Sequence, residues 1–156
     1  MKKVLGNLVE GACMLLVVAL AIVVFLQVFN RFVLKAPLAW SEDLAMLLFQ
    51  WVAFLGAAVG VKRVRHFGIE LVVKRMSVGA RHWIEILVPF IMGIVAVTMI
   101  TEGYTLIQLN RNRIYSSMDL SYIFAYLPIP ISGILMIVFL IQQEARRLMG
   151  QKGEGG

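Results

Sequence analysis

Four long apolar blocks, separated by short polar segments, dominate the chain. A helix that crosses about 30 Å of hydrocarbon needs about 20 residues, because each residue adds about 1.5 Å to its length. The blocks that reach this length cover about residues 8–32, 38–61, 83–109 and 120–142. Pro128 and Pro130, in the last block, predict a bend or an irregular first turn. The pattern predicts an all-α integral membrane protein with four transmembrane helices.

A shorter amphipathic segment, residues 67–78, lies between the second and third blocks. Its apolar and charged residues fall on different sides of a helix, with Ile69, Val72, Val73 and Met76 on one side and Glu70, Lys74 and Arg75 on the other. The segment is too short to span a membrane. We therefore expect a short helix in the cytoplasmic interface, with its basic edge toward anionic lipid headgroups. An ordinary solvated loop is the alternative.

The composition excludes several classes of protein. Hydrophobic residues make up 60% of the chain and charged residues 15%, and the mean hydropathy is +0.85. A soluble domain has about 45–50% hydrophobic and about 25% charged residues. A soluble globular domain and a disordered chain are both excluded. The single cysteine, Cys13, excludes a disulfide framework. Only residues 150–156 are polar and glycine-rich, so we expect a disordered tail after one membrane domain, residues 1–149.

The net charge of +6 indicates topology rather than binding to nucleic acid. The lysines and arginines lie between the apolar blocks, 11 on the side that both termini share and 4 on the other. By the positive-inside rule, the N and C termini are cytoplasmic. The first block is too long for a cleaved signal peptide, and no small-residue cleavage site precedes Arg31. The expected interface anchors are Lys62, Arg63, Arg65, Lys74, Arg75 and Trp83 at the inner surface, and Trp40, Tyr115 and Tyr122 at the outer surface.

Polar residues inside the blocks gather near the predicted outer surface. They are Gln27, Asn30, Arg31, Glu42, Asp43 and Glu102, and Arg111 and Arg113 follow Glu102. A charge at the bilayer centre costs about 2.5 to 3.5 kcal/mol on insertion scales and is seldom kept without a partner. These residues could form one buried ion-pair network that acts in assembly. The alternative is local: Glu42 and Asp43 stabilise a helix N-terminus, and Arg31 extends to the headgroups.

The second block has one face of small and polar residues. They are Gln50, Ala53, Gly56, Ala57 and Gly60, and they include the spacing G-x-x-x-G. Small residues let two helix backbones approach closely. The face could pack inside the chain or against a partner. Trp51 lies far from both predicted interfaces, and we expect it to pack against another helix or lipid tails.

Residues for catalysis or cofactor binding are scarce. His66 and His82 are 16 residues apart, without the spacing of a helix-borne metal site. There is no phosphate-binding G-x-x-x-x-G-K, and no matched pair of broken helices of the kind that a self-sufficient transporter uses. The sequence therefore predicts neither an enzyme nor a cofactor or metal site, and favours an accessory membrane subunit.

One stretch of the sequence resembles a known family. It comprises residues 27–33 (QVFNRFV), 36–45 (APLAWSEDLA), 48–51 (LFQW), 54–58 (FLGAA) and 62–66 (KRVRH). These residues look like the small permease subunit of tripartite ATP-independent periplasmic (TRAP) transporters. The later segments, Tyr126-Leu-Pro128-Ile-Pro130 and Ser117-Met-Asp-Leu120, are compatible, although many members have Ser-Pro-Ala-Leu at the latter.

The resemblance implies a scaffold subunit of a sodium-coupled importer in the bacterial cytoplasmic membrane. A periplasmic binding protein would deliver an organic acid to a large permease subunit, and the present chain would support and anchor that subunit. The implied partners are the large permease, transiently the binding protein, and membrane lipids. Two alternatives are a self-assembling channel or exporter lined by the Gln50 face, and a membrane enzyme that uses His66 and His82.

Overall fold

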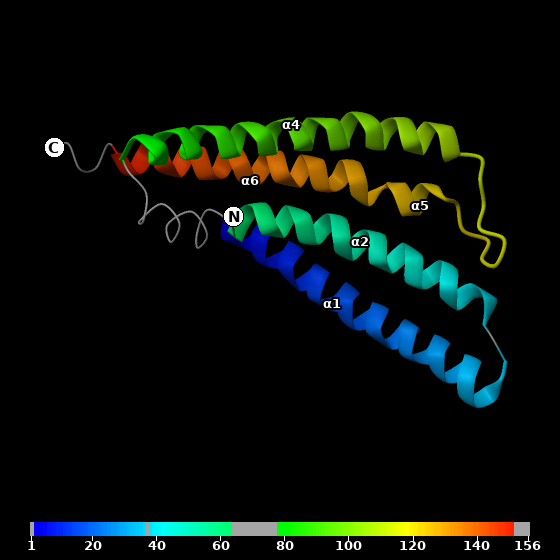
Figure 1. Cartoon of the computed structure of the whole chain (residues 1–156). Coiled ribbons are helices and arrows are strands. Elements are labelled where there is room, and N and C mark those ends of the chain that lie inside the picture. The colour runs from blue at the N-terminus through cyan, green and yellow to red at the C-terminus, as the bar shows by residue number, and fades with distance from the viewer. Residues whose placement is uncertain (1, 37, 64–77, 152–156) are drawn as a thin grey trace.

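All the regular secondary structure in the described part of the chain is helical. The structure is a computed structural model, and it describes residues 2–36, 38–63 and 78–151, with side chains within 5–36, 38–63 and 86–145. The helical elements in chain order are α1 Lys2–Phe29, η1 Asn30–Leu34, α2 Ala39–Arg63, α4 Val78–Asn110, α5 Ile123–Tyr126 and α6 Pro128–Gln151 (Figure 1). The prediction of an all-α chain is confirmed.

Four stretches of these helices are long and apolar enough to cross a membrane, as the sequence predicts. They are Leu5–Leu34, Ala39–Arg63, Ile86–Asn110 and Ile123–Ala145. The helices reach beyond the predicted blocks, since α4 already begins at Val78 and α6 ends at Gln151. Of the predicted amphipathic helix only Val78 is described, and residues 67–77 lie outside the described residues. Gly150 and Gln151 of the predicted tail belong to α6, and the rest of that tail is also outside.

The helices form two antiparallel hairpins that pack side by side. The first hairpin is α1 with α2, the second is α4 with α6, and α2 packs against α6 to join them. Figure 1 shows that α1 begins and α6 ends at one end of the bundle, which we call the terminal end. The loop before α2 and the loop of residues 111–122 lie at the opposite end, the loop end. The shared position of the two termini is the arrangement that an even number of spans requires.

The main core lies where α2, α4 and α6 meet. Its buried residues are Ala58, Val61, Ala96, Met136, Phe139 and Leu140. Glycine lets α4 and α6 approach closely, since a Cβ at Gly133 would lie 2.7 Å from the carbonyl oxygen of Ala96 and one at Gly103 would lie 2.7 Å from Cδ of Pro130. The closest backbone packing therefore uses two glycines on α4 and α6, not the G-x-x-x-G spacing of α2.

Two irregular segments sit at the loop end. The last turns of the first span widen into the π-helix η1, and Lys35 then ends it in the left-handed conformation, with φ 53°. In the last span the regular helix is interrupted at Leu127, between α5 and α6. Proline at positions 128 and 130 removes two backbone N–H donors there. This confirms the irregular first turn that the two prolines predict.

Candidate assembly surfaces

The predicted outer polar residues do not come together at one place. Gln27, Arg31 and Glu42 line an open cavity of about 490 Å³ at the loop end, between η1 and the start of α2. Asn30 Nδ2 instead donates a hydrogen bond to the carbonyl oxygen of Leu26, at 2.8 Å. Both salt bridges between described side chains lie elsewhere, so Arg31 pairs with neither Glu42 nor any other described acid.

Asp43 and Glu102 do not line that cavity. Asp43 accepts a hydrogen bond from Oγ of Ser117, in the loop of residues 111–122. Glu102 is exposed on α4, which packs mainly on α6. In the described part of the chain, Arg31, Glu42, Asp43 and Glu102 therefore form no ion pairs with one another. The sequence gives each residue's depth in the membrane, but it does not give the lateral order of the helices.

The small-residue face of α2 is divided between two environments. A Cβ at Gly56 would lie 3.9 Å from Sγ of Cys13 on α1, so this position faces a helix of the same chain. Ala53 and Ala57 are exposed, and a Cβ at Gly60 would meet nothing within 4 Å. Gln50 is half-buried, and its Oε1 is buried without a partner in the described structure. Most of this face is thus not covered by the chain's own described helices.

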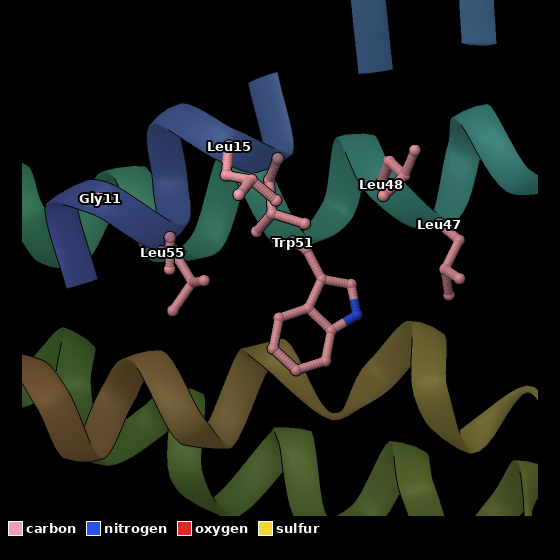
Figure 2. Close-up of a pocket in the computed structure, with 8 residues that line it drawn as sticks. Gly11, Leu15, Leu47, Leu48, Trp51 and Leu55 are labelled. Carbon is pink, nitrogen blue, oxygen red and sulfur yellow. The ribbon is translucent and has the colours of Figure 1, made fainter. Parts of the chain in front are cut away.

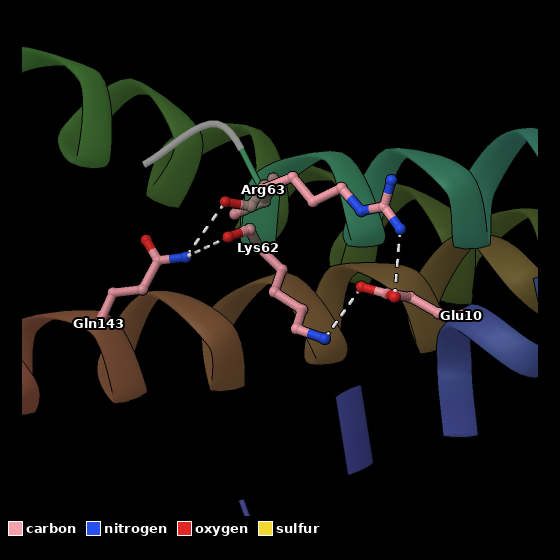
Figure 3. Close-up of polar contacts among 5 residues, drawn as sticks. Glu10, Lys62, Arg63 and Gln143 are labelled. Atoms are coloured by element: carbon pink, nitrogen blue, oxygen red, sulfur yellow. Dashed lines mark hydrogen bonds and ion pairs between the residues drawn. The ribbon is translucent and has the colours of Figure 1, made fainter. Parts of the chain in front are cut away.

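A polar clamp that sequence reasoning missed holds the terminal end of α2. Glu10 on α1 accepts a hydrogen bond from Nζ of Lys62 at 2.9 Å and from a guanidinium nitrogen of Arg63 at 3.2 Å (Figure 3). From the other side, Nε2 of Gln143 on α6 donates to the carbonyl oxygens of Val61 at 3.1 Å and Lys62 at 3.3 Å. These carbonyls belong to the last turn of α2, where the helix leaves acceptors unpaired. We call Glu10, Lys62, Arg63 and Gln143 the polar clamp.

The sequence does carry a signal for this clamp. Glu10 lies 26 residues before Ala36 and Lys62 lies 26 residues after it. In an antiparallel hairpin that turns near residue 36, equal distances from the turn place the two side chains at the same level. Lys62 and Arg63, predicted only as interface anchors, therefore also hold α1 to α2. The side chains of the other inner anchors, Arg65, Lys74, Arg75 and Trp83, lie outside the described side chains.

Trp51 joins the two hairpins by a hydrogen bond. An apolar groove of about 580 Å³ separates part of α1 from α2, and Trp51 is among its lining residues. Figure 2 shows the indole pointing from α2 toward the segment that contains α5. Its Nε1 donates to the carbonyl oxygen of Phe124 at 2.9 Å. A regular helix would pair this carbonyl with the N–H four residues later, and that residue is Pro128. Trp51 thus satisfies an acceptor that the proline leaves free.

The aromatic residues predicted for an outer belt have different roles. Trp40 is 39% exposed, whereas Tyr115 is only 4% exposed. Tyr115 stacks on Tyr122, with ring centroids 4.0 Å apart and ring planes 9° from parallel. A short antiparallel bridge between Ile114 and Ser121 brings the two rings together. Burial raises the pKa of the Tyr115 phenol above its ordinary value of 10.0, and the neighbouring Tyr122 adds to the rise. The prediction of a headgroup-facing Tyr115 is wrong because the loop folds it inward.

The described part of the chain holds no cluster of metal-ligating side chains. The residues there contain no group of three or more His, Cys, Asp or Glu placed to hold a metal ion. His66 and the side chain of His82 lie outside the described residues. The described polar groups instead close helix ends, join helices, or face outward from the bundle.

Comparison with known proteins identifies the group of transporters to which the sequence is similar. Residues 20–150 match the family described as tripartite ATP-independent periplasmic transporters, DctQ component. The chain is 26% identical, over 88% of its length and 79% of the relative's, to the sialic acid TRAP transporter small permease protein SiaQ of Vibrio cholerae.

Two further relatives are longer proteins. One is the sialic acid TRAP transporter permease protein SiaT of Haemophilus influenzae, 27% identical over 91% of this chain and 23% of the relative. The other is the isethionate TRAP transporter permease protein DctMQ of Oleidesulfovibrio alaskensis, 28% identical over 70% of this chain and 18% of the relative. The family match covers most of the four-helix bundle, and the chain belongs to the DctQ-component family of tripartite ATP-independent periplasmic transporters.

Proposed function

We propose that this chain is the scaffold subunit of a TRAP-type importer and that it works in complex with a large membrane permease. The observation that carries the proposal is the use of polar groups in the bundle. The polar clamp and the Trp51 hydrogen bond tie helices to one another, and the main core between them is apolar. Such a bundle can hold its shape in the membrane, whereas a pathway for an organic anion would need polar groups aligned across it.

The size of the relatives supports a large permease as the partner. The part similar to this chain makes up 23% of the SiaT permease and 18% of the DctMQ permease. In those proteins a similar sequence is one segment of a much longer chain. We infer that the present chain associates with a separate subunit that supplies the remaining permease sequence.

The cargo that we propose is an organic acid, taken up with sodium. The names of the relatives mention sialic acid and isethionate, both of which are acids. In this proposal a periplasmic binding protein delivers the acid, and the terminal end of the bundle faces the cytoplasm. The 11 basic residues on the side of the termini support this orientation.

Reconstitution in proteoliposomes tests the proposal. The chain is inserted alone, with its large permease, or with that permease and the binding protein. We expect sodium-dependent uptake of a labelled organic acid only with all three proteins, and a stable complex of the chain with the permease on purification. Uptake by the chain alone, or a homo-oligomer that conducts ions, would favour a self-assembling channel instead.

A further inference from the structure

A stripe of polar side chains runs along α4 on the side that faces away from α6. Its members, which we call the α4 polar stripe, are Thr98, Thr101, Glu102, Thr105 and Gln108, and all five are exposed. Counted from Thr98, they occupy positions i, i+3, i+4, i+7 and i+10, so they share one side of the helix. The opposite side of α4 is used inside the chain, where Ala96 is buried in the core and Gly103 lies against Pro130.

Within the stripe, Glu102 is the residue for which the described part of the chain supplies no partner. The hydroxyl groups of Thr98, Thr101 and Thr105 donate to backbone carbonyl oxygens of the preceding turn, at 3.0 to 3.2 Å. Nε2 of Gln108 donates to the hydroxyl of Tyr104 at 3.0 Å. The carboxylate of Glu102 has no hydrogen bond or ion pair with any side chain that the structure describes. It is the group on this surface that most needs a donor from outside.

Glu102 lies within the apolar span of α4 and not at its end. The span ends at Asn110, eight residues after Glu102, which is about 12 Å along a helix axis. A glutamate side chain is too short to reach the end of the span from there, and lipid tails offer no hydrogen-bond donor. By contrast, the exposed side of α1 carries apolar residues, among them Leu15 and Phe25, which suit lipid.

An apolar groove continues this surface toward the terminal end. It lies between α4 and α6, has a volume of about 570 Å³, and is lined by residues that include Phe90, Gly93, Ile94 and Thr98. A Cβ at Gly93 would meet nothing within 4 Å, so the groove is open beside it. Thr98 belongs both to the groove and to the stripe. Together they extend from Phe90 to Gln108, about 27 Å along α4, which approaches the length of a transmembrane helix.

We propose that this surface, the groove and the α4 polar stripe, binds one transmembrane helix of the large permease, which places a hydrogen-bond donor or a cation against Glu102. The inference rests on the proposed function, because that function requires a large permease. A second copy of this chain fits the surface less well. A symmetric contact would bring Glu102 close to its own copy, and two carboxylates repel each other in a medium of low dielectric constant.

Photocrosslinking identifies what covers this surface. A photoactivatable phenylalanine analogue replaces Ile94 or Thr105 on the proposed surface, and Leu15 or Phe25 on α1 as exposed controls, in membranes that contain the complete transporter. We expect adducts with the large permease from positions 94 and 105 and not from positions 15 and 25. Adducts with the permease only from α1, or adducts of positions 94 and 105 only with a second copy or with lipid, would overturn the inference.

Substitution of Glu102 gives an independent measurement. In hydrocarbon, Glu102→Leu should improve insertion of the chain if lipid covers position 102. If the permease covers it, the same change should lower the yield of complex about tenfold, while Glu102→Gln keeps part of it through hydrogen bonding. The amount of the small chain itself, measured in the same membranes, separates a loss of binding from a loss of folding. Thr105→Val is the control on the same side, because its hydroxyl is already paired within α4.

The two proposals fail in different ways. If the unaltered chain neither purifies with the large permease nor supports uptake with it, the proposed function is wrong. If the unaltered complex forms and transports, but Glu102→Leu forms it equally well, only the docking surface on α4 is wrong.

Discussion

The hydrogen bond from Trp51 to Phe124 gives a prediction with its own internal control. Trp51→Phe keeps an aromatic ring but removes the indole N–H, which now lies 2.9 Å from the Phe124 carbonyl oxygen. That carbonyl cannot pair within its own helix, because Pro128 has no N–H. This hydrogen bond is exposed at the surface of the bundle, and side-chain hydrogen bonds between membrane helices average about 0.6 kcal/mol and reach about 1.7. We expect Trp51→Phe to lower the free energy of unfolding by about 1 kcal/mol.

Pro128→Ala should remove the need for the indole. Alanine at position 128 supplies the N–H that a continuous helix would direct at Phe124, as Leu127 N already does to the Ile123 carbonyl oxygen at 2.9 Å. In that background, Trp51→Phe should lose less stability. The difference between the two costs, the coupling energy of the double-mutant cycle, should be about 0.6 to 1.7 kcal/mol.

Unfolding by a denaturing detergent, followed by circular dichroism, measures all four proteins of this cycle. Pro128→Ala creates a small cavity at a buried position. Its cost to stability cancels in the cycle, because the proteins with and without Trp51→Phe in the Pro128→Ala background both contain the cavity. Equal costs of Trp51→Phe in the two backgrounds would refute the reasoning. Trp51 would then stabilise the bundle by packing alone.

Three further predictions concern packing, the polar clamp and topology. Gly133→Ala should destabilise the bundle by about 1 to 3 kcal/mol, because the new Cβ would meet a backbone oxygen at 2.7 Å. Gly93→Ala is the control and should be nearly neutral, because its Cβ would enter open space. Equal effects of the two changes in detergent unfolding would contradict this packing. Glu10→Gln should lower the free energy of unfolding by up to about 1 kcal/mol, and this loss should shrink at high salt, because the ion-pair partners are partly exposed. A loss of stability that salt leaves unchanged would argue against an ionic contribution. In a cysteine-free background, a cysteine at Ser117 should react with an impermeant maleimide added outside intact cells and one at Gly153 should not, and outside labelling of position 153 would reverse the orientation.

The number of spans was predictable because the membrane sets the minimum length of each one. Each crossing needs about 20 apolar residues, and no soluble fold requires four such blocks in 156 residues. The break before α6 was also predictable, since Pro128 and Pro130 cannot donate backbone hydrogen bonds. These features depend on local chemistry alone.

The lateral order of the helices was not predictable from the pattern. In a soluble helix, the apolar side marks the core, but a membrane helix is apolar toward both its neighbours and the lipid. The sequence therefore could not show that α2 and α4 both pack on α6. For the same reason the pattern could not show that Glu102 lies on a different side of the bundle from Arg31 and Glu42. The buried position of Tyr115 depends on a turn of the outer loop that no periodic pattern marks.

Two glutamates within the spans show how the structure divides the chain's polar groups. Glu10 on α1 has its cations, Lys62 and Arg63, on the next helix of the same chain. The folding of this chain alone pairs the Glu10 carboxylate with these cations, so Glu10 fixes how α1 and α2 pack. Glu102 on α4 has no such partner among the described residues and points out of the bundle. A carboxylate within an apolar span requires a hydrogen-bond donor, so Glu102 is paired only when another chain packs beside it. The first glutamate therefore specifies the fold, and the second specifies which side of the fold the rest of the transporter must cover.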